Sequence, residues 1–351
     1  AHDCRNPKLT ASITIGAGLT LPQLPLLSQI LQGIPGGLDT LDLGLPFSGH
    51  ALCMSDDGRT AYATSSSSTN AVINLDDITN PTLIQLFAPA GHDCGLNPDG
   101  SRLYLAQFGF VALGLGLPNG PAVGQNGMGI YDVSALHNRS TAPVPLLIAP
   151  TPAQVGFLPW TNIAIGEAPS AGSHTARWFR NNGRTYLYSS DEWPTAGVCP
   201  WAHGRIIDIT DETKPVKVSD IKLEVNDPAH CAETEPDVAN YSAHYVGFDD
   251  VQNATTLFTT HYSGGLRVWD IRDPAKPREI AYWHPVPNPR TPTVPLSEFF
   301  GSSAARWDAV PTYVRYRPET GHIWIASYSA GFQILAFTPS AGPTAPKPTG
   351  R

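Results

Sequence analysis

The chain has 351 residues, with 34 prolines, 32 glycines and only 15% charged residues, a composition typical of many short strands and turns and not of long helices. Its formal net charge of −8 argues against a nucleic-acid partner, because the average surface field would repel the phosphate backbone. No apolar run reaches the about 18 residues that a membrane helix needs, so we expect no membrane span.

A unit of four short strands repeats along the chain. Each copy begins at what we call a ring position, runs through a polar turn to a second strand with an aromatic residue, and continues to a third strand and a Pro-led fourth strand. In chain order the ring positions are His50, His92, His174, His244 and Thr312, and the aromatic residues are Tyr62, Tyr104, Tyr186, Phe258 and Trp324. Such units cannot bury their apolar faces alone, so we expect them to pack around an axis with the ring positions facing it.

The third and fourth strands make the repeat explicit. They are read at 70–81, 129–143, 204–215 and 265–277. The fifth copy has a third strand at 331–335 but no Pro-led strand after it. The segment 6–15 resembles the missing strand, so we expect residues 1–15 to complete the last unit and leave no free sheet edge.

The run 264–277, which reads Gly-Gly-Leu-Arg-Val-Trp-Asp-Ile-Arg-Asp-Pro-Ala-Lys-Pro, resembles the LVIVD-repeat β-propellers. The other copies extend the resemblance over most of the chain. It implies an all-β fold, a β-propeller with five recognisable blades, although 93–173 and 175–243 are long enough to hold more strands, so six or seven blades stay open. It implies little about function, because the family spans enzymes, adhesins and proteins of no assigned role.

We expect a single propeller domain over residues 1–338, with an apolar insertion at 16–47 and a disordered tail at 339–351. Every long connection falls on the face where the first strands begin, called here the top face. These connections are 16–47, 109–127, 151–172, 191–203, 224–242 and 286–310. Loops of this length usually bind a ligand or cover a site, so the top face is predicted to be the working face.

Five cysteines, three sequons and a start at Ala1 predict a secreted glycoprotein whose signal peptide has been removed. The sequon asparagines are Asn138, Asn240 and Asn253. We expect Cys199 to pair with Cys231, because both lie in long connections on one face. Two of Cys4, Cys53 and Cys94 can pair, and the third stays free unless it pairs between molecules. An alternative is that all five cysteines are buried reduced thiols.

The top mouth of the channel should collect titratable side chains whose pKa values apolar walls can shift. For acid–base catalysis we favour His261, oriented by Asp191 or Glu192, with His174 and His244 as further catalytic candidates. The candidates for substrate binding are His50, His92, Gln107, Phe108, Trp193, Thr312 and Tyr328. The insertions 16–47 and 107–118 are rich in Leu and Phe, which favours a small apolar molecule as partner, although they can also pack on neighbouring blades.

The repeated histidine has three interpretations. Common descent of the blades can keep it for a structural hydrogen-bond network. It can act as an acid or base without a cofactor. It can also bind one copper, zinc or iron ion, with His50, His92, His174 and His244 as ligands, although no short His-x-His spacing supports this.

The favoured hypothesis is a secreted enzyme that acts on a small apolar molecule. In length, sequons, apolar top loops and acid–base cluster the chain resembles the fungal hetero-Diels–Alderases of tropolonic sesquiterpenoid biosynthesis. That resemblance implies loss of water from a hydroxymethyl tropolone to an o-quinone methide, followed by cycloaddition to a cyclic terpene alkene held nearby. The alternatives are a metal-dependent oxidase or hydrolase and a binding or adhesion propeller without chemistry. The oligomeric state stays open.

Overall fold

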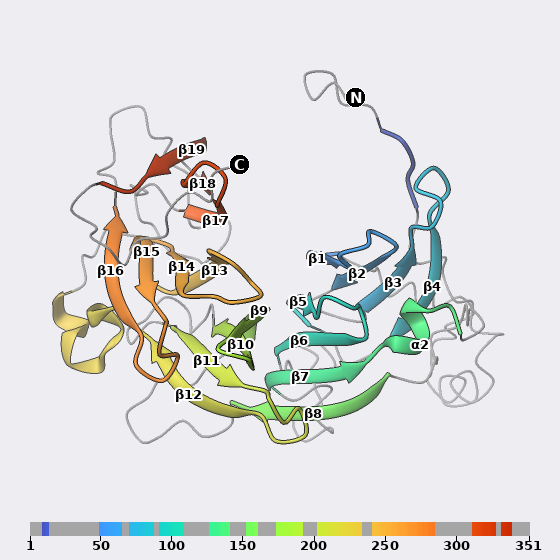
Figure 1. Cartoon of the computed structure of the whole chain (residues 1–351), viewed down its shortest axis with the longest axis horizontal. Coiled ribbons are helices and arrows are strands. Elements are labelled where there is room, and N and C mark those ends of the chain that lie inside the picture. The colour runs from blue at the N-terminus through green and yellow to red at the C-terminus, as the bar shows by residue number, and fades with distance from the viewer. Residues whose placement is uncertain are drawn as a thin grey trace, which may run out of the picture.

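The computed structural model describes residues 9–13, 49–64, 70–87, 91–108, 126–140, 152–160, 173–191, 202–233, 241–284, 311–327 and 331–338. These residues form five antiparallel sheets placed one after another around a central axis (Figure 1). This is a five-bladed β-propeller arrangement, and it confirms the fold class predicted from the repeat.

The blades follow the chain in order. Blade 1 holds β1 (Ala51–Met54), β2 (Thr60–Thr64), β3 (Asn70–Asn74) and β4 (Thr82–Phe87). Blade 2 holds β5 (Asp93–Leu96), β6 (Arg102–Phe108), β7 (Asn126–Asp132) and β8 (Ala153–Pro159). Blade 3 holds β9 (Ser173–Asn181), β10 (Arg184–Asp191), β11 (Gly204–Asp208) and β12 (Val216–Ile221). Blade 4 holds β13 (Ala243–Phe248), β14 (Thr256–His261), β15 (Gly265–Asp270) and β16 (Arg278–Trp283). Blade 5 holds β17 (Pro311–Arg317), β18 (His322–Ser327) and β19 (Gly331–Ala336).

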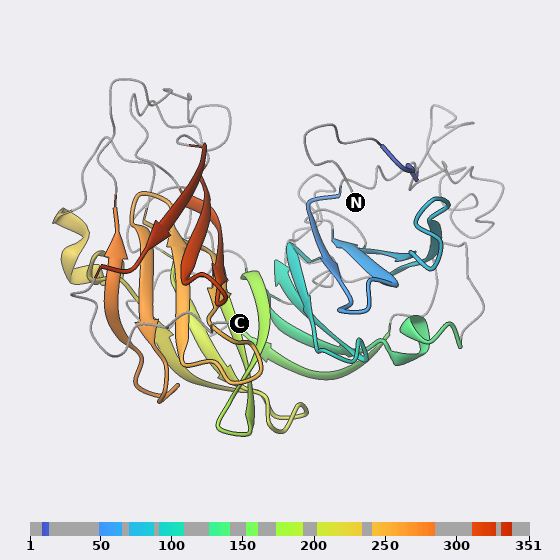
Figure 2. The ribbon, with the colours of Figure 1, turned by 45° about the horizontal axis from the view of Figure 1, so that its top comes forward.

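The first strand of each blade lies nearest the axis and the last strand lies at the outside (Figures 1 and 2). The second strands are buried on both faces, because neighbouring blades pack face to face; every residue of β2 and of β14 is buried. The predicted aromatics fill these interfaces. Tyr62, Tyr104 and Phe258 are at most 1% exposed, and full burial of a side chain such as Phe258 stabilises the fold by roughly 2 kcal/mol.

Short turns join the first and second strands on the face opposite the ring positions, called here the bottom face, as the sequence predicts. Four of these turns contain Gly58, Gly100, Gly183 and Gly321, whose φ angles lie between 70° and 78°. A side chain would strain the backbone there, which is why the predicted Gly-containing turns close the hairpins. Two sequon asparagines, Asn138 and Asn253, are exposed in turns, and Asn240 lies outside the described residues.

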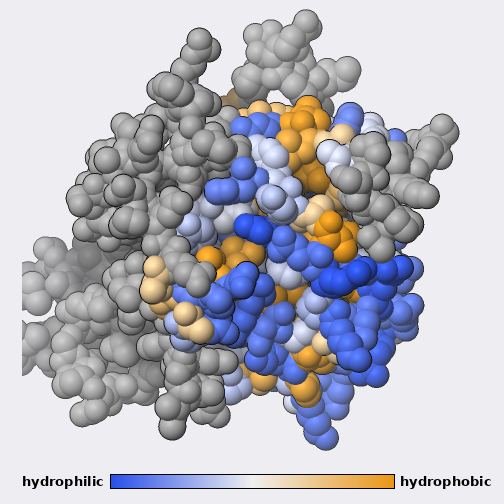
Figure 3. All heavy atoms as spheres, turned by 90° about the vertical axis from the view of Figure 1, so that its left-hand side faces the viewer, coloured by the Kyte–Doolittle hydropathy of each residue, from blue (hydrophilic) through white to orange (hydrophobic). Residues whose placement is uncertain are grey.

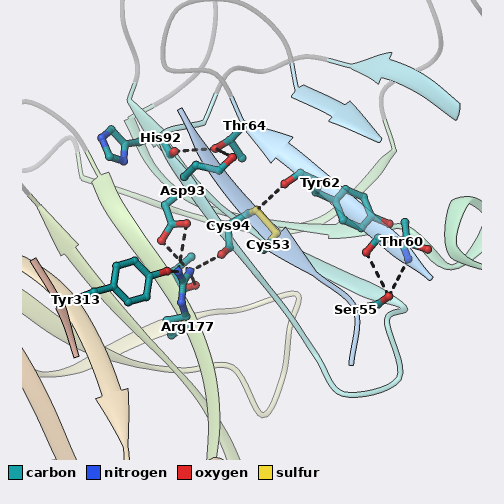
Figure 4. The surroundings of a disulfide bond; sticks show 12 residues. Cys53, Ser55, Thr60, Tyr62, Thr64, His92, Asp93, Cys94, Arg177 and Tyr313 are labelled. Carbon is teal, nitrogen blue, oxygen red and sulfur yellow. Dashed lines mark hydrogen bonds and ion pairs between the residues drawn. A yellow bond between two sulfur atoms is a disulfide. The ribbon is translucent and has the colours of Figure 1, made fainter. Parts of the chain in front are cut away.

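A disulfide joins Cys53 of β1 to Cys94 of β5, with the Cα atoms 5.7 Å apart (Figure 4). It links the inner strands of blades 1 and 2 and selects one of the pairings that the sequence left open. Cys231 is also disulfide-bonded, and its partner lies outside the described residues. The pairing of Cys231 with Cys199 therefore stays a prediction.

The fourth strand of blade 2 was predicted wrongly. The sequence placed its start at 142–143, but β8 occupies Ala153–Pro159, inside a segment expected to be a top-face loop. The chain after β7 forms instead a short helix, α2 (Ser134–His137), because Val133 and Leu136 are buried between blades 1 and 2. The predicted loop 224–242 likewise contains two 3-10 turns, η3 (Glu224–Asn226) and η4 (Pro228–Glu233).

The predicted closure of the last blade is not seen in the described residues. Blade 5 has three described strands, and 9–13 forms no strand; Ile13 packs instead on the apolar cluster of blade 1. Most of 1–15, the insertion 16–47 and the tail 339–351 lie outside the described residues, so those boundaries stay predictions. Phe332 and Ile334 of β19 are 62% and 55% exposed. Figure 3 shows apolar surface near the top of the molecule, the end at which β19 lies in Figure 1.

Among the described residues, no helix has the length and apolar character needed to cross a membrane.

Candidate functional site

Four imidazoles form a row at the top end of the central axis. They belong to His50, His92, His174 and His244, one from each of the first four blades. Adjacent ring centroids lie 4.0 Å, 4.0 Å and 4.7 Å apart in that order. The prediction that these side chains meet is confirmed. We call this set the imidazole row.

Hydroxyl groups of one blade fix the backbone at the ring position of the next blade. Thr64 at the end of β2 donates its hydroxyl to the carbonyl of His92 at 2.7 Å (Figure 4). Ser190 at the end of β10 donates in the same way to the carbonyl of His244 at 3.0 Å. Because these donors come from the second strand of the preceding blade, each such blade fixes where the next residue of the row lies along the central axis.

Blade 2 departs from this scheme, whereas blade 5 follows it with a threonine at the ring position. Blade 2 has Ala106, which carries no hydroxyl, at the equivalent position. There the side chain of His92 forms a hydrogen bond with the backbone of His174. In blade 5, the carbonyl of Thr312 accepts the hydroxyl of Thr260 at 3.1 Å, and the Thr312 hydroxyl donates to the carbonyl of Ala326 at 3.1 Å. The hydroxyl of Thr312, predicted to bind substrate, is thus used within its own blade.

The inner members of the row are neutral at neutral pH. Burial lowers the pKa of His92 to about 2 and that of His244 to about 3, and burial with neighbouring imidazoles holds the pKa of His174 well below its usual range. His50 is the exposed end of the row. Partial burial lowers its pKa below the usual value, and the nearby carboxylate of Asp93 opposes this shift without reversing it. His50 is therefore the member best placed to exchange a proton with a ligand.

A buried ion pair lies beside the row. Asp93 is 1% exposed, and its Oδ2 lies 2.7 Å from Nη1 of Arg177 in β9. Nη2 of Arg177 also reaches the hydroxyl of Tyr313 at 3.5 Å, and these three side chains point toward one another (Figure 4). Burial raises the pKa of Asp93 and the guanidinium opposes this shift. The pair places a carboxylate near His50 that can stabilise a protonated imidazole.

Tyrosines extend the row toward blade 5. The ring of Tyr245 lies 4.4 Å from that of His244 and stacks on Tyr313 at 4.5 Å. Tyr262 lies 4.7 Å from His244. The described end of the axis is therefore lined by flat rings from blades 1 to 5.

The predicted acid–base pair of His261 and Asp191 does not form. His261 is fully buried, with Nε2 3.1 Å from the hydroxyl of Thr259 and Nδ1 3.4 Å from the carbonyl of Tyr241. Asp191 instead pairs with Arg205 at 2.5 Å. Each residue thus has another partner, because Asp191 ends β10 of blade 3 and is held by the neighbouring strand β11. Burial lowers the pKa of His261 to about 3, so this histidine is a neutral core group.

The remaining predicted residues are less informative. Gln107 is buried between blades 1 and 2 and donates its amide to the hydroxyl of Tyr131 at 2.5 Å, so it is used in the core. Phe108 ends β6, but its side chain is not described. Glu192, Trp193 and Tyr328 lie outside the described residues, and the pairing of His261 with Glu192 stays a prediction.

The row does not converge on one point. Within the described ranges, no three His, Cys, Asp or Glu side chains are placed to hold one metal ion. The four imidazoles therefore pack as adjacent rings and not as a set of converging ligands.

Sequence reasoning missed Asp93, Arg177, Tyr245 and Tyr313. A signal was present, because three of them directly follow a ring position: Asp93 follows His92, Tyr245 follows His244, and Tyr313 follows Thr312. Aligning the residue after each ring position would have placed them together. Arg177 lies further along its strand, and Gly95 on β5 allows the β9 backbone to approach closely, since a Cβ there would meet the carbonyl of Ala176 at 2.4 Å.

Comparisons with known proteins extend the fold assignment. No protein-family model matches the sequence, and a search of curated proteins found no match, so the predicted resemblances to LVIVD-repeat propellers and to hetero-Diels–Alderases are not confirmed. Solved β-propellers do match.

A periplasmic gluconolactonase of Pseudomonas aeruginosa, PpgL, shares 13% identity at a TM-score of 0.52 over 84% of this chain and 67% of that one. A putative 6-phosphogluconolactonase from Bacteroides uniformis shares 13% at 0.48 over 83% and 68%. The β-propeller domain of Myceliophteria thermophila Cps50 (Swd1) shares 10% at 0.46 over 83% and 67%. Such identities show a shared fold and nothing about activity.

Proposed function

We propose that the protein is a secreted enzyme that acts on a small, largely apolar molecule at the top end of the axis, with His50 as the group that transfers protons. The observation that carries this proposal is the imidazole row, in which one exposed histidine ends a series of buried neutral ones. A disulfide between Cys53 and Cys94 supports secretion, since such bonds persist in oxidising compartments.

The surroundings of His50 suit this role. At neutral pH its imidazole is mostly neutral and can accept a proton, because its pKa is lowered. The carboxylate of Asp93 then stabilises the imidazolium that forms. Leu52 and Met54 lie on the face of β1 opposite Cys53 and are 57% and 53% exposed. Leu52 is two residues from His50 on the same face of the strand, so it offers apolar surface next to the proton-transfer group, and Met54 continues that surface along the strand.

The specific reaction we propose is dehydration followed by cycloaddition. His50 accepts the proton of a ring hydroxyl on a hydroxymethyl tropolone, the C–O bond of the hydroxymethyl group breaks, and the departing hydroxide leaves as water with that proton. The o-quinone methide then adds to a terpene alkene held against the apolar surface. Positioning of the two reactants is the main contribution of the protein in that second step.

Hydrolysis of a lactone is a second candidate at the same residues. A neutral His50 can activate water as well as a hydroxyl group, and one fold neighbour is named as a gluconolactonase. The two reactions need different substrates, so one set of assays separates them.

The test is an assay of the purified protein with a hydroxymethyl tropolone and a cyclic terpene alkene, and separately with glucono-1,5-lactone. We expect the cycloadduct, detected by mass spectrometry, and a loss of about 100-fold or more in rate for His50→Ala. The matched control is His322→Ala, which removes a histidine from the bottom end of β18 and should keep the full rate. A His50→Ala variant with the wild-type rate would exclude the proposed role.

A further inference from the structure

A cavity lies on the bottom face, between blades 2 and 3. Its volume is about 740 Å³, within the range of small-molecule sites. The rim is formed by turns: Asn97–Asp99 after β5, Ile209–Thr213 between β11 and β12, and Gln252 between β13 and β14. It faces away from the imidazole row, since every one of these turns lies at the opposite ends of the strands.

The wall of this cavity is held rigid by contacts between the blades. Glu212 accepts the Nε–H of Arg102 at 2.7 Å and the hydroxyl of Tyr104 at 3.1 Å, so both of its oxygens are used. Gly156 lets the turn approach β8, because a Cβ there would lie 1.9 Å from the carbonyl of Glu212. Oδ1 of Asp211 accepts both the N–H and the hydroxyl of Thr213, at 3.1 Å and 2.6 Å.

The lining groups that can contact a ligand include an indole, a guanidinium and an amide. Trp178 and Arg180 are two residues apart on β9, so they lie on the same face of the strand and both line the cavity. No ion pair or side-chain hydrogen bond is found for Arg180 within the described ranges, whereas hydrogen bonds to Val251 and Ala254 anchor its backbone. The Gln252 side chain adds one donor group and one acceptor.

These groups match the chemistry of a sugar. Sugar hydroxyls both donate and accept, which suits a guanidinium, an amide and carboxylate oxygens, and the C–H face of a pyranose can lie flat on an indole. An anion is a poorer fit, because the cavity lining holds the three carboxylates of Asp99, Asp211 and Glu212 against two guanidinium groups. A neutral ligand avoids this imbalance.

A sequon stands at the rim. Asn253 directly follows Gln252, is exposed, and begins the sequence Asn-Ala-Thr that accepts an N-linked glycan. A neutral oligosaccharide can therefore reach the cavity from the chain itself or from solution. The chemistry of recognition is the same in both cases.

We propose that the cavity between blades 2 and 3 binds a neutral oligosaccharide, either free or linked to Asn253, with Trp178 as the stacking platform and Arg180 as the main hydrogen-bond donor. The site is independent of the proposed enzyme activity. It makes the bottom face a carbohydrate-binding surface.

The test uses the full chain made as Asn253→Gln, so that no glycan is present at the rim, and di-N-acetylchitobiose, the first two sugars of an N-glycan, with cellobiose and maltose for comparison. Binding is measured by calorimetry and by saturation-transfer NMR. We expect one of these disaccharides to bind, and Trp178→Ala and Arg180→Gln to weaken it about tenfold or more. Because the side chain of Arg180 is exposed, Arg180→Gln should fold, and it therefore tests the proposal even if Trp178→Ala does not fold.

Two controls locate the binding. His50→Ala should leave the affinity unchanged, and Tyr282→Ala removes an aromatic ring that is 68% exposed on β16 and should also have no effect. With glycosylated wild-type protein, loss of disaccharide binding identifies the chain's own glycan as the occupant, and retained binding identifies a free ligand. Failure of all three sugars to bind, or binding that Arg180→Gln leaves unchanged, overturns the proposal. If sulfate binds in the cavity in place of the sugars, and high salt abolishes that binding, the cavity is an anion site and the proposal is also overturned.

Discussion

At the scale of single residues, the ion pair of Asp93 and Arg177 is the contact that holds a charge next to the row. We expect Arg177→Met to reduce the free energy of unfolding by about 3–5 kcal/mol, because it leaves the buried carboxylate of Asp93 unpaired. The double variant with Asp93→Asn should recover much of this loss. Urea denaturation at pH 7 measures both.

The matched control for that experiment is an exposed pair. Arg184 lies against Asp208 at the surface, with 60% of its side chain exposed, so Arg184→Met should leave the denaturation midpoint unchanged. Equal losses for the buried and exposed variants would mean that Asp93 is not desolvated in the folded protein.

The residues of the site differ in how far sequence could find them. His50 and its three partners in the row were predictable, because the repeat places them at one position of each blade. The partner of Asp191 was not, because Arg205 comes from the next strand and no repeat or short spacing marks it. The neutral state of His261 depends on burial inside blade 4, which no local pattern shows.

At the scale of strands, the hydroxyl bonds between blades carry a separate prediction. Thr64→Val and Thr260→Val keep the shape of the side chain and remove its donor to the next blade. We expect each to lower the free energy of unfolding by about 1 kcal/mol. Thr79→Val, which changes an exposed turn hydroxyl bonded to Asp77, provides the comparison. If the midpoint in urea shifts no more for Thr64→Val than for Thr79→Val, these bonds do not join the blades.

Most strands were readable from the sequence, because the third strands and the Pro-led fourth strands repeat with the same turn residues. Blade 2 was the exception. Its fourth strand β8 begins directly after Pro152, as β4, β12 and β16 begin after Pro81, Pro215 and Pro277. The signal was assigned instead to Pro143, which lies nearer to the end of the third strand, because no pattern marked the helix that comes between them. The pairing of Cys53 with Cys94 follows from two inner strands being neighbours, which the sequence implied only once the blades were ordered.

At the scale of the whole molecule, the buried histidines make stability depend on pH. A histidine whose pKa is lowered by folding binds fewer protons in the folded state than in the unfolded state. Its contribution to the free energy of unfolding is complete above pH 6.5, the pKa in the unfolded state. That contribution is lost as the pH falls toward the pKa in the folded state, which is about 2 for His92 and about 3 for His244 and His261. Asp93, whose pKa is raised, acts in the opposite direction.

We therefore expect the free energy of unfolding to fall between pH 6.5 and 4.5 by about 1.4 kcal/mol per pH unit for each of these histidines. Urea denaturation at half-unit pH steps measures the slope. His92→Gln should reduce the slope by the share of one histidine. A free energy of unfolding that does not change between pH 6.5 and 4.5 would show that the imidazoles are not buried.

The most direct test of the central claim is an NMR titration of the histidine rings in the intact protein between about pH 8 and pH 5. We expect the signals of His92, His174 and His244 to stay those of neutral rings throughout, and the signal of His50 to titrate below 6.5. Titration of all four near 6.5 would contradict the account, because rings in contact and shielded from water cannot each bind a proton independently.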